Sequence, residues 1–381
     1  MAFVPLSVFS ALFHLYVGWR VVPSMSLWPA AQTLFLALLV ASAFLMPLGL
    51  LSRRVRSQPA ADILAWVGLL FMGLFSSLFV LALLRDALLL AAWLVLAIEP
   101  AEYSLEQLAA VTAAAVPALG LLVTAIGFLN ARRTAAVTVV DVPLKGLPAA
   151  LAGFTVVQIS DIHVGPTIKA RYLTAIVNKV NSLQADMVAV TGDLVDGSVA
   201  QLGAHVAPLA GLQSTHGTYF VTGNHEYYSG AHSWITELRR LGVRVLMNEH
   251  VVLRHGGAGL VVAGVADYSA HHFDEAHRSD PHAAIAGAPD DAIIRILLAH
   301  QPRSSAAAAE AGFHLQLSGH THGGQFLPWN LFVRFQQPFT AGLHRLKGLW
   351  VYTSRGTGYW GPPKRFGAPS EITHLRFVPA E

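Results

Sequence analysis

Four long stretches without a formally charged side chain fill most of the first 130 or so residues, and no other feature constrains the fold of this chain as strongly. Hydrophobic residues make up 54% of the chain and charged residues only 12%, whereas soluble domains are about 25% charged. Spanning a bilayer takes about 20 apolar residues, so each stretch is a candidate membrane helix. The alternative, buried helices of a soluble core, conflicts with their length, because such helices rarely exceed about 14 residues without a charge. The stretches are residues 3–19, 27–51, 63–84 and 108–129.

A fifth apolar segment, residues 87–98, is short and follows Arg85 and Asp86. It can extend the third helix beyond the bilayer, lie at the interface, or make a further crossing. We expect the extension or the interfacial helix, and therefore about four transmembrane helices within residues 1–134.

Basic residues in the short loops predict the orientation, because cytoplasmic loops carry an excess of Lys and Arg. Arg53, Arg54 and Arg56 follow the second stretch, and Arg132 and Arg133 follow the fourth. With four crossings both clusters face the cytoplasm, together with both termini and the C-terminal part; a fifth crossing would reverse the C-terminal part. We therefore expect a multi-pass membrane protein. Residues 1–10 carry no basic side chain, so no cleaved signal peptide is expected.

The charge and cysteine counts exclude several classes of function. Lys and Arg number 25 against 22 Asp and Glu, without a long basic run, so nucleic acid is not an expected partner. The absence of cysteine excludes a disulfide scaffold and a thiolate metal site. Histidine is plentiful, with 18 residues, so any metal site is expected to use imidazole.

From about residue 135 the pattern becomes that of a soluble domain, residues 135–381. Turn residues at Pro143, Gly146, Pro148 and Gly153 come first, and apolar strands then alternate with helical spacing over residues 168–183. This alternation predicts an α/β layered domain with helices covering the sheets. The expected strands are residues 154–159, 186–190, 218–221, 293–298, 313–317, 349–353 and 372–377.

Side chains that can bind a metal follow five of these strands, at the ends where ligands gather in α/β folds. Taken singly, an Asp or Asn there is more often a turn or helix cap, and a His is more often a hydrogen-bonded surface residue. Five occurrences in one domain favour a metal site instead. The residues are Asp161 and His163; Asp193 and Asp196; Asn224, His225 and Glu226; His300; and His320 and His322.

The donor types indicate which metals and which chemistry to expect. Carboxylate oxygen, amide oxygen and imidazole nitrogen without sulfur suit Mn, Fe or Zn. Seven or more ligands are too many for one tetrahedral ion and suit two divalent ions. Two ions about 3.5–4 Å apart can share a carboxylate and a hydroxide, which gives a nucleophile near neutral pH and a clamp for a phosphoryl oxygen. The sequence therefore predicts hydrolysis of a phosphoester.

The ordered motifs D-x-H, G-D-x-x-D, G-N-H-E, a lone His and G-H-x-H resemble those of the calcineurin-like metallophosphoesterase superfamily. They extend from Asp161 to His322, and the ordered set is far more specific than any single motif. The preceding membrane helices, "GDLVDG", "GHTHGGQ" and the ending "SRGTGYWGPPKRFGAPSEITHLRF" resemble the membrane-anchored bacterial branch of that superfamily. The resemblance implies a four-layer α/β/β/α sandwich, here preceded by an all-α transmembrane region, and a multi-pass location in the bacterial inner membrane.

The resemblance also implies a role for each motif residue. His225 would lie beside the substrate as general acid or stabiliser of the transferring phosphoryl group, and Asp193 would bridge both metals. Asp196 and Glu226 would orient the ligands. The first metal would be held by Asp161, His163 and His322, and the second by Asn224, His300 and His320.

Residues 325–348 give information about the substrate, because this segment is rich in aromatic and basic side chains. Such a segment suits a membrane interface or a pocket for acyl chain and phosphate, and the alternative is ordinary packing of a long loop against the sandwich. Some relatives of the branch resemble pyrophosphatases of UDP-2,3-diacylglucosamine. The leading hypothesis is hydrolysis of a phosphoester or pyrophosphate in a lipid-linked substrate such as that one. The segment contains Phe326, Leu327, Trp329, Leu331, Phe332, Phe335 and Phe339, with Arg334, Arg345 and Lys347.

Two other functions stay open at this point. The first is a broad-specificity phosphodiesterase that acts on nucleotides or cell-envelope polymers. The second is a transporter or receptor that uses the phosphoesterase fold for docking, although transport normally marks spans with buried ionisable residues and here His14, Arg85 and Asp86 are the exceptions. Four further histidines are expected in a solvated loop: His271, His272, His277 and His282.

Overall fold

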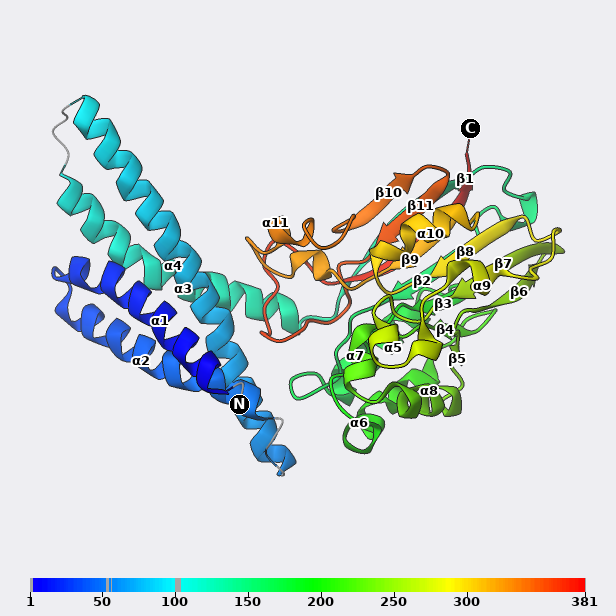
Figure 1. Ribbon diagram of the computed structural model, residues 1–381, viewed down its shortest axis with the longest axis horizontal. Coiled ribbons are helices and arrows are strands. Elements are labelled where there is room, and N and C mark those ends of the chain that lie inside the picture. The colour runs from blue at the N-terminus through cyan, green and yellow to red at the C-terminus, as the bar shows by residue number, and fades with distance from the viewer. Residues whose placement is uncertain (1–2, 53–54, 56, 100–103, 381) are drawn as a thin grey trace. The chain divides into compact units, whose positions relative to one another are not determined.

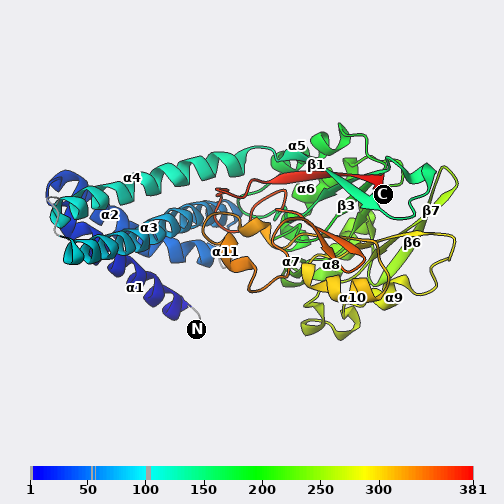
Figure 2. The same ribbon diagram turned by 90° about the horizontal axis from the view of Figure 1, so that it is seen from above.

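The protein, described here by a computed structural model over residues 3–52, 55, 57–99 and 104–380, divides into two compact units. The helical unit holds the chain up to Leu129 together with Gly361–Lys364. The sandwich unit holds Asn130–Trp360 and the chain from Arg365 onward. Figures 1 and 2 show the helices of the first and the sheets of the second.

The helical unit contains four helices that are long and apolar enough to cross a membrane. Three of them contain a predicted apolar stretch whole, and α2 begins two residues after the start of the second stretch. Large apolar side chains such as Trp19, Phe44 and Ile98 are exposed along them, which suits contact with lipid and not with water. The elements are α1 (Phe3–Val21), η1 (Val22–Met25), α2 (Pro29–Leu51), α3 (Gln58–Ile98) and α4 (Leu105–Arg132), the last of which ends in the sandwich unit.

Helix α3 is continuous over 41 residues, so residues 87–98 extend the third helix, which is the first of the two expected arrangements. At 1.5 Å per residue it is about 62 Å long, about twice the thickness of the hydrocarbon core. Arg85 and Asp86 do not interrupt it, because α1 supplies partners for both. Arg85 donates to the carbonyl of Arg20 at 2.8 Å, and Asp86 accepts from Arg20 at 2.8 Å and from Tyr16 at 2.7 Å. The predicted basic cluster Arg53, Arg54 and Arg56 lies outside the described residues.

The first sheet of the sandwich unit has six strands, four of which are parallel and adjacent. Their carboxyl ends therefore meet at one edge. β12 runs antiparallel to β2 and parallel to β1. The spatial order is β1 (Ala136–Leu144), β12 (Glu371–Pro379), β2 (Thr155–Ile159), β3 (Met187–Val190), β4 (Thr218–Phe220) and β5 (Arg244–Val245).

The second sheet also has six strands, and β7, β8, β9 and β11 are parallel. Antiparallel strands close both edges. The order is β10 (Gly342–Leu346), β11 (Leu349–Thr353), β9 (Leu315–Ser318), β8 (Ile294–Leu298), β7 (Ala258–Gly264) and β6 (Glu249–His255). All seven predicted strands are present, whereas β1, β5, β6, β7 and β10 were not predicted.

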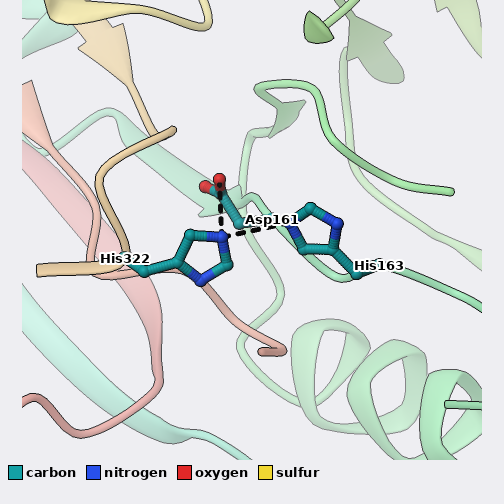
Figure 3. Close-up of side chains that lie close together, drawn as sticks. All are labelled: Asp161, His163 and His322. Atoms are coloured by element: carbon teal, nitrogen blue, oxygen red, sulfur yellow. Dashed lines mark hydrogen bonds and ion pairs between the residues drawn. The ribbon is translucent and has the colours of Figure 1, made fainter. Parts of the chain in front are cut away.

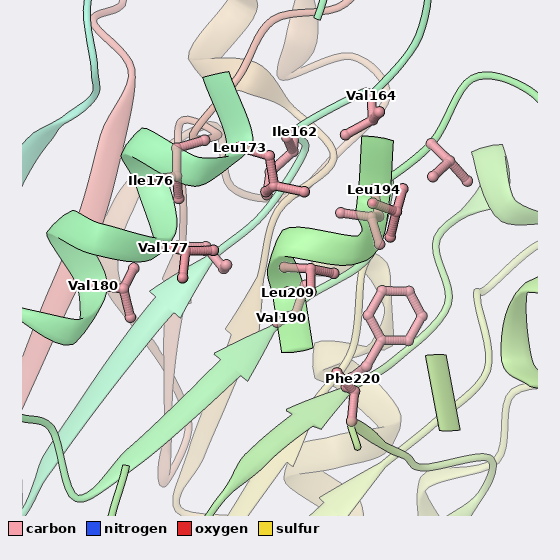
Figure 4. Close-up of a cluster of buried hydrophobic side chains, with 14 of the residues drawn as sticks. Ile162, Val164, Leu173, Ile176, Val177, Val180, Val190, Leu194, Leu209 and Phe220 are labelled. Atoms are coloured by element: carbon pink, nitrogen blue, oxygen red, sulfur yellow. The ribbon is translucent and has the colours of Figure 1, made fainter. Parts of the chain in front are cut away.

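Helices cover the outer face of each sheet, which confirms the predicted four-layer α/β/β/α sandwich. In α5, residues at helical spacing such as Leu173, Ile176 and Val180 pack against Val190 and Phe220 of the first sheet (Figure 4). Burial of each such side chain contributes about 1.5–3 kcal/mol. A second core fills the space between the sheets. The covering helices are α5 (Ala170–Asn181), α6 (Val199–Val206) and α8 (Ala231–Arg240) on the first sheet, and α9 (Pro281–Ile285) and α10 (Ser305–Glu310) on the second.

Short helical turns complete the sandwich unit between these elements. They are η3 (Ala149–Leu151), η4 (Ala207–Gly211), α7 (Asn224–Tyr228), η5 (Ala270–His272), η6 (Glu275–His277), η7 (Pro302–Ser304), η8 (His322–Gly324) and α11 (Asn330–Val333). The expectation of a solvated loop for the four further histidines is wrong in part, because three lie in η5 or η6, His282 lies in α9, and the His277 side chain is only 17% exposed.

Candidate metal centre

The predicted site residues meet at the carboxyl ends of β2, β3, β4, β8 and β9. Each follows its strand by no more than a few residues, so the two sheets present their polar side chains to one place. Three groups have ligand atoms within 4.8 Å of one another. They are Asp161, His163 and His322 (Figure 3); Asp193, His300 and His320; and His163, Asp193 and His225.

Asp193 lies between the two ends of this centre. Its Oδ2 is 3.1 Å from Nε2 of His300 on one side and 3.9 Å from Nε2 of His163 on the other. Imidazole nitrogens also face each other: Nε2 of His163 is 3.0 Å from Nε2 of His322, and Nε2 of His300 is 3.2 Å from Nδ1 of His320. Such convergence of lone pairs and carboxylates fits cations bound between them.

Asn224 gives an independent indication of a cation-binding site. Its side-chain oxygen Oδ1 is buried and has no hydrogen-bond partner among the described residues. A buried amide oxygen without a partner is costly, and amide oxygen is a suitable ligand for a hard or borderline divalent ion. This orphaned atom therefore fits the predicted role of Asn224 at the second metal.

The backbone of the site is strained at the same residues. Five of the nine described non-glycine residues with positive φ are candidate ligands. This conformation costs about 1–3 kcal/mol for a non-glycine residue and concentrates at functional sites. Their side chains thus take positions that an ordinary strand end would not give them. The five are Asp161, His163, Asp193, His320 and His322.

Two motif glycines allow the close approach of the chain segments. A Cβ at Gly223 would clash with the carboxylate of Asp193, and one at Gly319 would clash with the carboxylate of Asp161. Any side chain at these positions would displace a candidate ligand. The glycines of G-N-H-E and G-H-x-H are therefore part of the geometry of the centre.

Asp196 and Glu226, which the resemblance gives an orienting role, contact residues of the centre. Asp196 Oδ1 lies 2.5 Å from Nδ1 of His225, and its Oδ2 lies 3.3 Å from Nδ1 of His163. Glu226 accepts hydrogen bonds from the backbone N–H groups of Asp193 at 2.9 Å and of Gly223 at 2.6 Å. Both carboxylates therefore fix side chains or loops of the centre.

Burial and neighbouring charges shift the pKa values of the centre in the metal-free chain. Burial and, as a smaller contribution, the adjacent His300 lower the pKa of His320 to about 3. Burial likewise lowers the pKa of His322 well below its ordinary value. Both imidazoles are therefore neutral at pH 7, which is the form that binds a metal. Burial raises the pKa of the Asp161 carboxyl, and a bound cation would oppose that effect.

His225 behaves in the opposite way. Burial by itself would lower its pKa, but the hydrogen bond to Asp196 and the charges of Asp193 and Asp196 raise the pKa to about 9. The imidazole is therefore protonated at neutral pH. Its Nε2 lies 4.0 Å from Oδ2 of Asp193, at the edge of the centre.

Three residues around the centre were missed by sequence reasoning. The buried Arg365 donates to the carbonyl of His322 at 2.8 Å and to that of Arg355 at 2.7 Å, which holds the last motif against the C-terminal segment. The rings of Tyr228 and Trp360 lie 5.2 and 5.6 Å from the ring of His225, and both residues are at least half exposed. The ending quoted above contains Arg365 and Trp360, but nothing in its spacing tied them to the motifs.

Comparison with known proteins finds similarity over the part of the chain that contains the candidate ligands. Residues 154–324 match the family described as calcineurin-like phosphoesterase. A transmembrane protein with metallophosphoesterase domain from Bos taurus is 42% identical over 276 residues, which cover 68% of this chain and 62% of the relative. An uncharacterized metallophosphoesterase of Helicobacter pylori (strain J99) is 40% identical over 226 residues, 59% of this chain and 60% of the relative. One of Aquifex aeolicus is 32% identical over 219 residues, 57% of this chain and 82% of the relative. The chain thus matches about three-fifths of the length of the first two relatives.

Proposed function

This chain belongs to the calcineurin-like metallophosphoesterase family, and we propose that it is a membrane-anchored, metal-dependent hydrolase of phosphoester or pyrophosphate bonds. The observation that carries the proposal is the position of Asp193 between two groups of candidate ligands. A single shared carboxylate suits two divalent ions, the number that this family uses.

The residues present fit such a pair of ions. Asp161, His163 and His322 would hold one ion, and Asn224, His300 and His320 the other, with Asp193 between them. When bound, two divalent ions supply a nucleophile near neutral pH and neutralise charge on the phosphoryl oxygens. Manganese, iron and zinc all suit these donors.

His225 supplies the proton in this proposal. Asp196 fixes the Nδ1 side of the ring, so Nε2 is directed to the centre with its proton in place below about pH 9. A group in this position can protonate the leaving oxygen or stabilise charge on the phosphoryl group. Glu226 and Asp196 act through Asp193, His163 and His225 and not on the substrate itself.

We assign a lipid-linked substrate from the surface beside the centre. Leu327, Trp329, Leu331, Phe332 and Phe335 are between 41% and 74% exposed, whereas Phe326 and Phe339 are packed. Most of this segment therefore does not pack against the sandwich as an ordinary loop would. Exposed apolar and aromatic side chains with Arg334 among them suit an acyl chain and an anionic headgroup. UDP-2,3-diacylglucosamine, which combines diacyl chains with a pyrophosphate, is the specific candidate.

The test uses the purified full-length chain in detergent with Mn²⁺, and Asp193→Ala as the matched inactive variant. We expect cleavage of the pyrophosphate of UDP-2,3-diacylglucosamine by the wild type alone. Faster hydrolysis of soluble phosphodiesters with that lipid left intact would reject the lipid-linked substrate and keep the hydrolase. No turnover of any phosphoester by metal-loaded protein would reject both.

A broad-specificity phosphodiesterase is the second candidate. It is favoured by the two aromatic rings beside His225, those of Tyr228 and Trp360, which we call the His225 rim. Tyr228 and Trp360 present exposed rings on which a nucleobase can stack. Replacing both rings by Leu should then raise KM for nucleotide diesters more than for a small diester without a base. Labelling of the sandwich unit from the outer face of intact cells would favour this candidate, because the proposed UDP-lipid is expected on the cytoplasmic side.

We also propose that the chain is a multi-pass protein of a bacterial inner membrane with the sandwich unit in the cytoplasm. Four candidate membrane helices and the basic residues Arg132 and Arg133 after the last of them support this orientation. Protease added to intact spheroplasts should leave the sandwich unit intact and should degrade it once the membrane is opened. Cleavage in intact spheroplasts would reverse the orientation.

A further inference from the structure

A second group of metal-binding side chains lies outside the proposed catalytic centre. His232 of α8 and Asp274 and His277 around η6 have ligand atoms within 4.8 Å of one another. Nε2 of His232 is 3.0 Å from Oδ2 of Asp274, and Nε2 of His277 is 3.9 Å from the same oxygen. The two segments are 42 residues apart in sequence, so the fold and not the local spacing brings them together.

Two of the three side chains are held in place by contacts on the side away from the group. Nδ1 of His277 is 2.9 Å from the hydroxyl of Tyr227, a buried residue. Oδ1 of Asp274 accepts a hydrogen bond from the backbone N–H of Ala276 at 3.0 Å. These contacts leave Nε2 of His277 and Oδ2 of Asp274 facing His232. A hydrogen bond that fixes the second nitrogen of a histidine is usual at metal sites, because it sets the tautomer that binds the ion.

We propose that His232, Asp274 and His277 form a peripheral site for a borderline divalent transition metal, with Zn²⁺ as its best occupant. Two imidazoles and one carboxylate are the ligand set of zinc sites that keep one position open. The His232 side chain is 74% exposed, so that position faces water and the side chain has room to close on the ion. Mg²⁺ and Ca²⁺ are disfavoured, because both prefer oxygen ligands.

An ion in this site would tie η6 to α8 beside the catalytic motif. Tyr227 follows directly after the G-N-H-E motif, and the ring of Phe273 lies 5.7 Å from that of Tyr227 and 5.5 Å from that of Tyr228. Tyr228 in turn packs against His225. The peripheral ion would therefore steady one aromatic wall of the His225 rim without touching the proposed catalytic ligands.

The test is the metal stoichiometry of the tag-free, full-length chain in detergent, stripped with chelator and titrated with Zn²⁺, then with Co²⁺ for its visible spectrum. His232→Ala removes an exposed ligand and leaves the fold undisturbed. Asp274→Asn keeps the contact with Ala276 but removes the charge. His271→Ala is the control, since His271 lies in η5 near the group but offers it no ligand atom.

We expect His232→Ala, Asp274→Asn and His277→Ala each to bind one equivalent less than the wild type, and His271→Ala to bind as many. The same loss should appear in an Asp193→Ala background, which separates the peripheral site from the catalytic centre. Equal stoichiometry in the wild type and the His232→Ala variant, or an equal loss in the His271→Ala control, would overturn the proposal.

Discussion

Both units of the protein bury charged side chains, but they satisfy them in different ways. In the helical unit Arg85 donates to the Arg20 carbonyl, the Ser24 hydroxyl and the Ala109 carbonyl, while Asp86 accepts from Arg20 and Tyr16. These contacts join α1, α3 and α4, and Nε of Arg85 and Oδ1 of Asp86 are the two buried side-chain atoms of the network without a hydrogen-bond partner among the described residues. This network supports a structural role, which weakens the idea of a transport pathway through these spans.

In the candidate metal centre of the sandwich unit, the buried side chains instead place atoms with lone pairs next to one another. Nitrogen faces nitrogen between His163 and His322, and the amide oxygen of Asn224 has no partner among the described residues. Residues of this centre also adopt strained backbone conformations. Burial of charge alone therefore does not identify a functional site; what distinguishes the candidate metal centre is the convergence of several imidazole nitrogens and carboxylate oxygens on one place.

The largest effect should come from Asp193→Ala. Loss of the shared carboxylate should lower phosphoesterase activity by about 10³-fold or more, because it removes a ligand from both proposed ions. Metal content, measured by mass spectrometry after gel filtration, should fall in parallel. The exposed Asp141, paired with Arg376 at 2.8 Å on the surface, provides the control: Asp141→Asn should leave both values unchanged. Full metal content in Asp193→Ala would contradict the bridging role.

His225→Ala should separate proton transfer from metal binding. We expect kcat to fall by about 10²–10⁴-fold, the usual contribution of a general acid, with metal content unchanged. A substrate whose leaving group needs no proton, such as a nitrophenyl ester, should lose much less. An equal loss with both kinds of leaving group would show that His225 stabilises phosphoryl charge instead.

Asp196→Asn should have an intermediate effect, about 10–100-fold on activity, since Asp196 acts by orienting His163 and His225. The contact between Asp196 and His225 also predicts that the free energy of unfolding of the metal-free protein depends on pH. The folded-state pKa of His225 is raised to about 9, above the ordinary value of 6.5, so its contribution to stability is complete below pH 6.5 and is lost as the pH rises through 9.

The measurement for this pH effect is urea unfolding of chelator-treated wild type and Asp196→Asn between pH 6 and 10. The difference in free energy of unfolding between the two proteins should be largest at pH 6 and should shrink toward pH 9–10, because the protonated His225 that Asp196 stabilises loses its proton over this range. A difference that grows with pH would mean that His225 is neutral in the folded chain.

Arg85→Met should give the smallest effect on chemistry. Removing one member of the interhelical network should destabilise the helical unit by about 1–3 kcal/mol, because buried partners lose their hydrogen bonds. Thermal unfolding in detergent should therefore occur at lower temperature, while kcat per metal-loaded molecule stays that of the wild type. A specific loss of kcat in folded protein would show that this network serves the catalytic centre and would remove the contrast between the units.

The sequence by itself determined the membrane helices, most of the strands and the candidate ligands, because the signals for them are local. An uncharged stretch longer than a soluble core helix, and an apolar strand followed by Asp, Asn or His, can each be read without knowledge of distant residues. The ordered motifs then indicated the family, the four-layer fold and the candidate ligands from Asp161 to His322. The unpredicted β1, β5, β6, β7 and β10 depend on pairing with neighbours, and β5 has only two residues.

The tertiary structure decided what depends on contacts between distant segments. It made α3 one continuous helix, because α1 and α4 supply partners for Arg85 and Asp86 in its middle. It placed Arg365 behind His322, 43 residues earlier, and set Tyr228 and Trp360 around His225. It also brought His232 to Asp274 and His277, which are three residues apart in the sequence. No spacing rule links residues of such distant segments, since their proximity follows only from the packing within each unit.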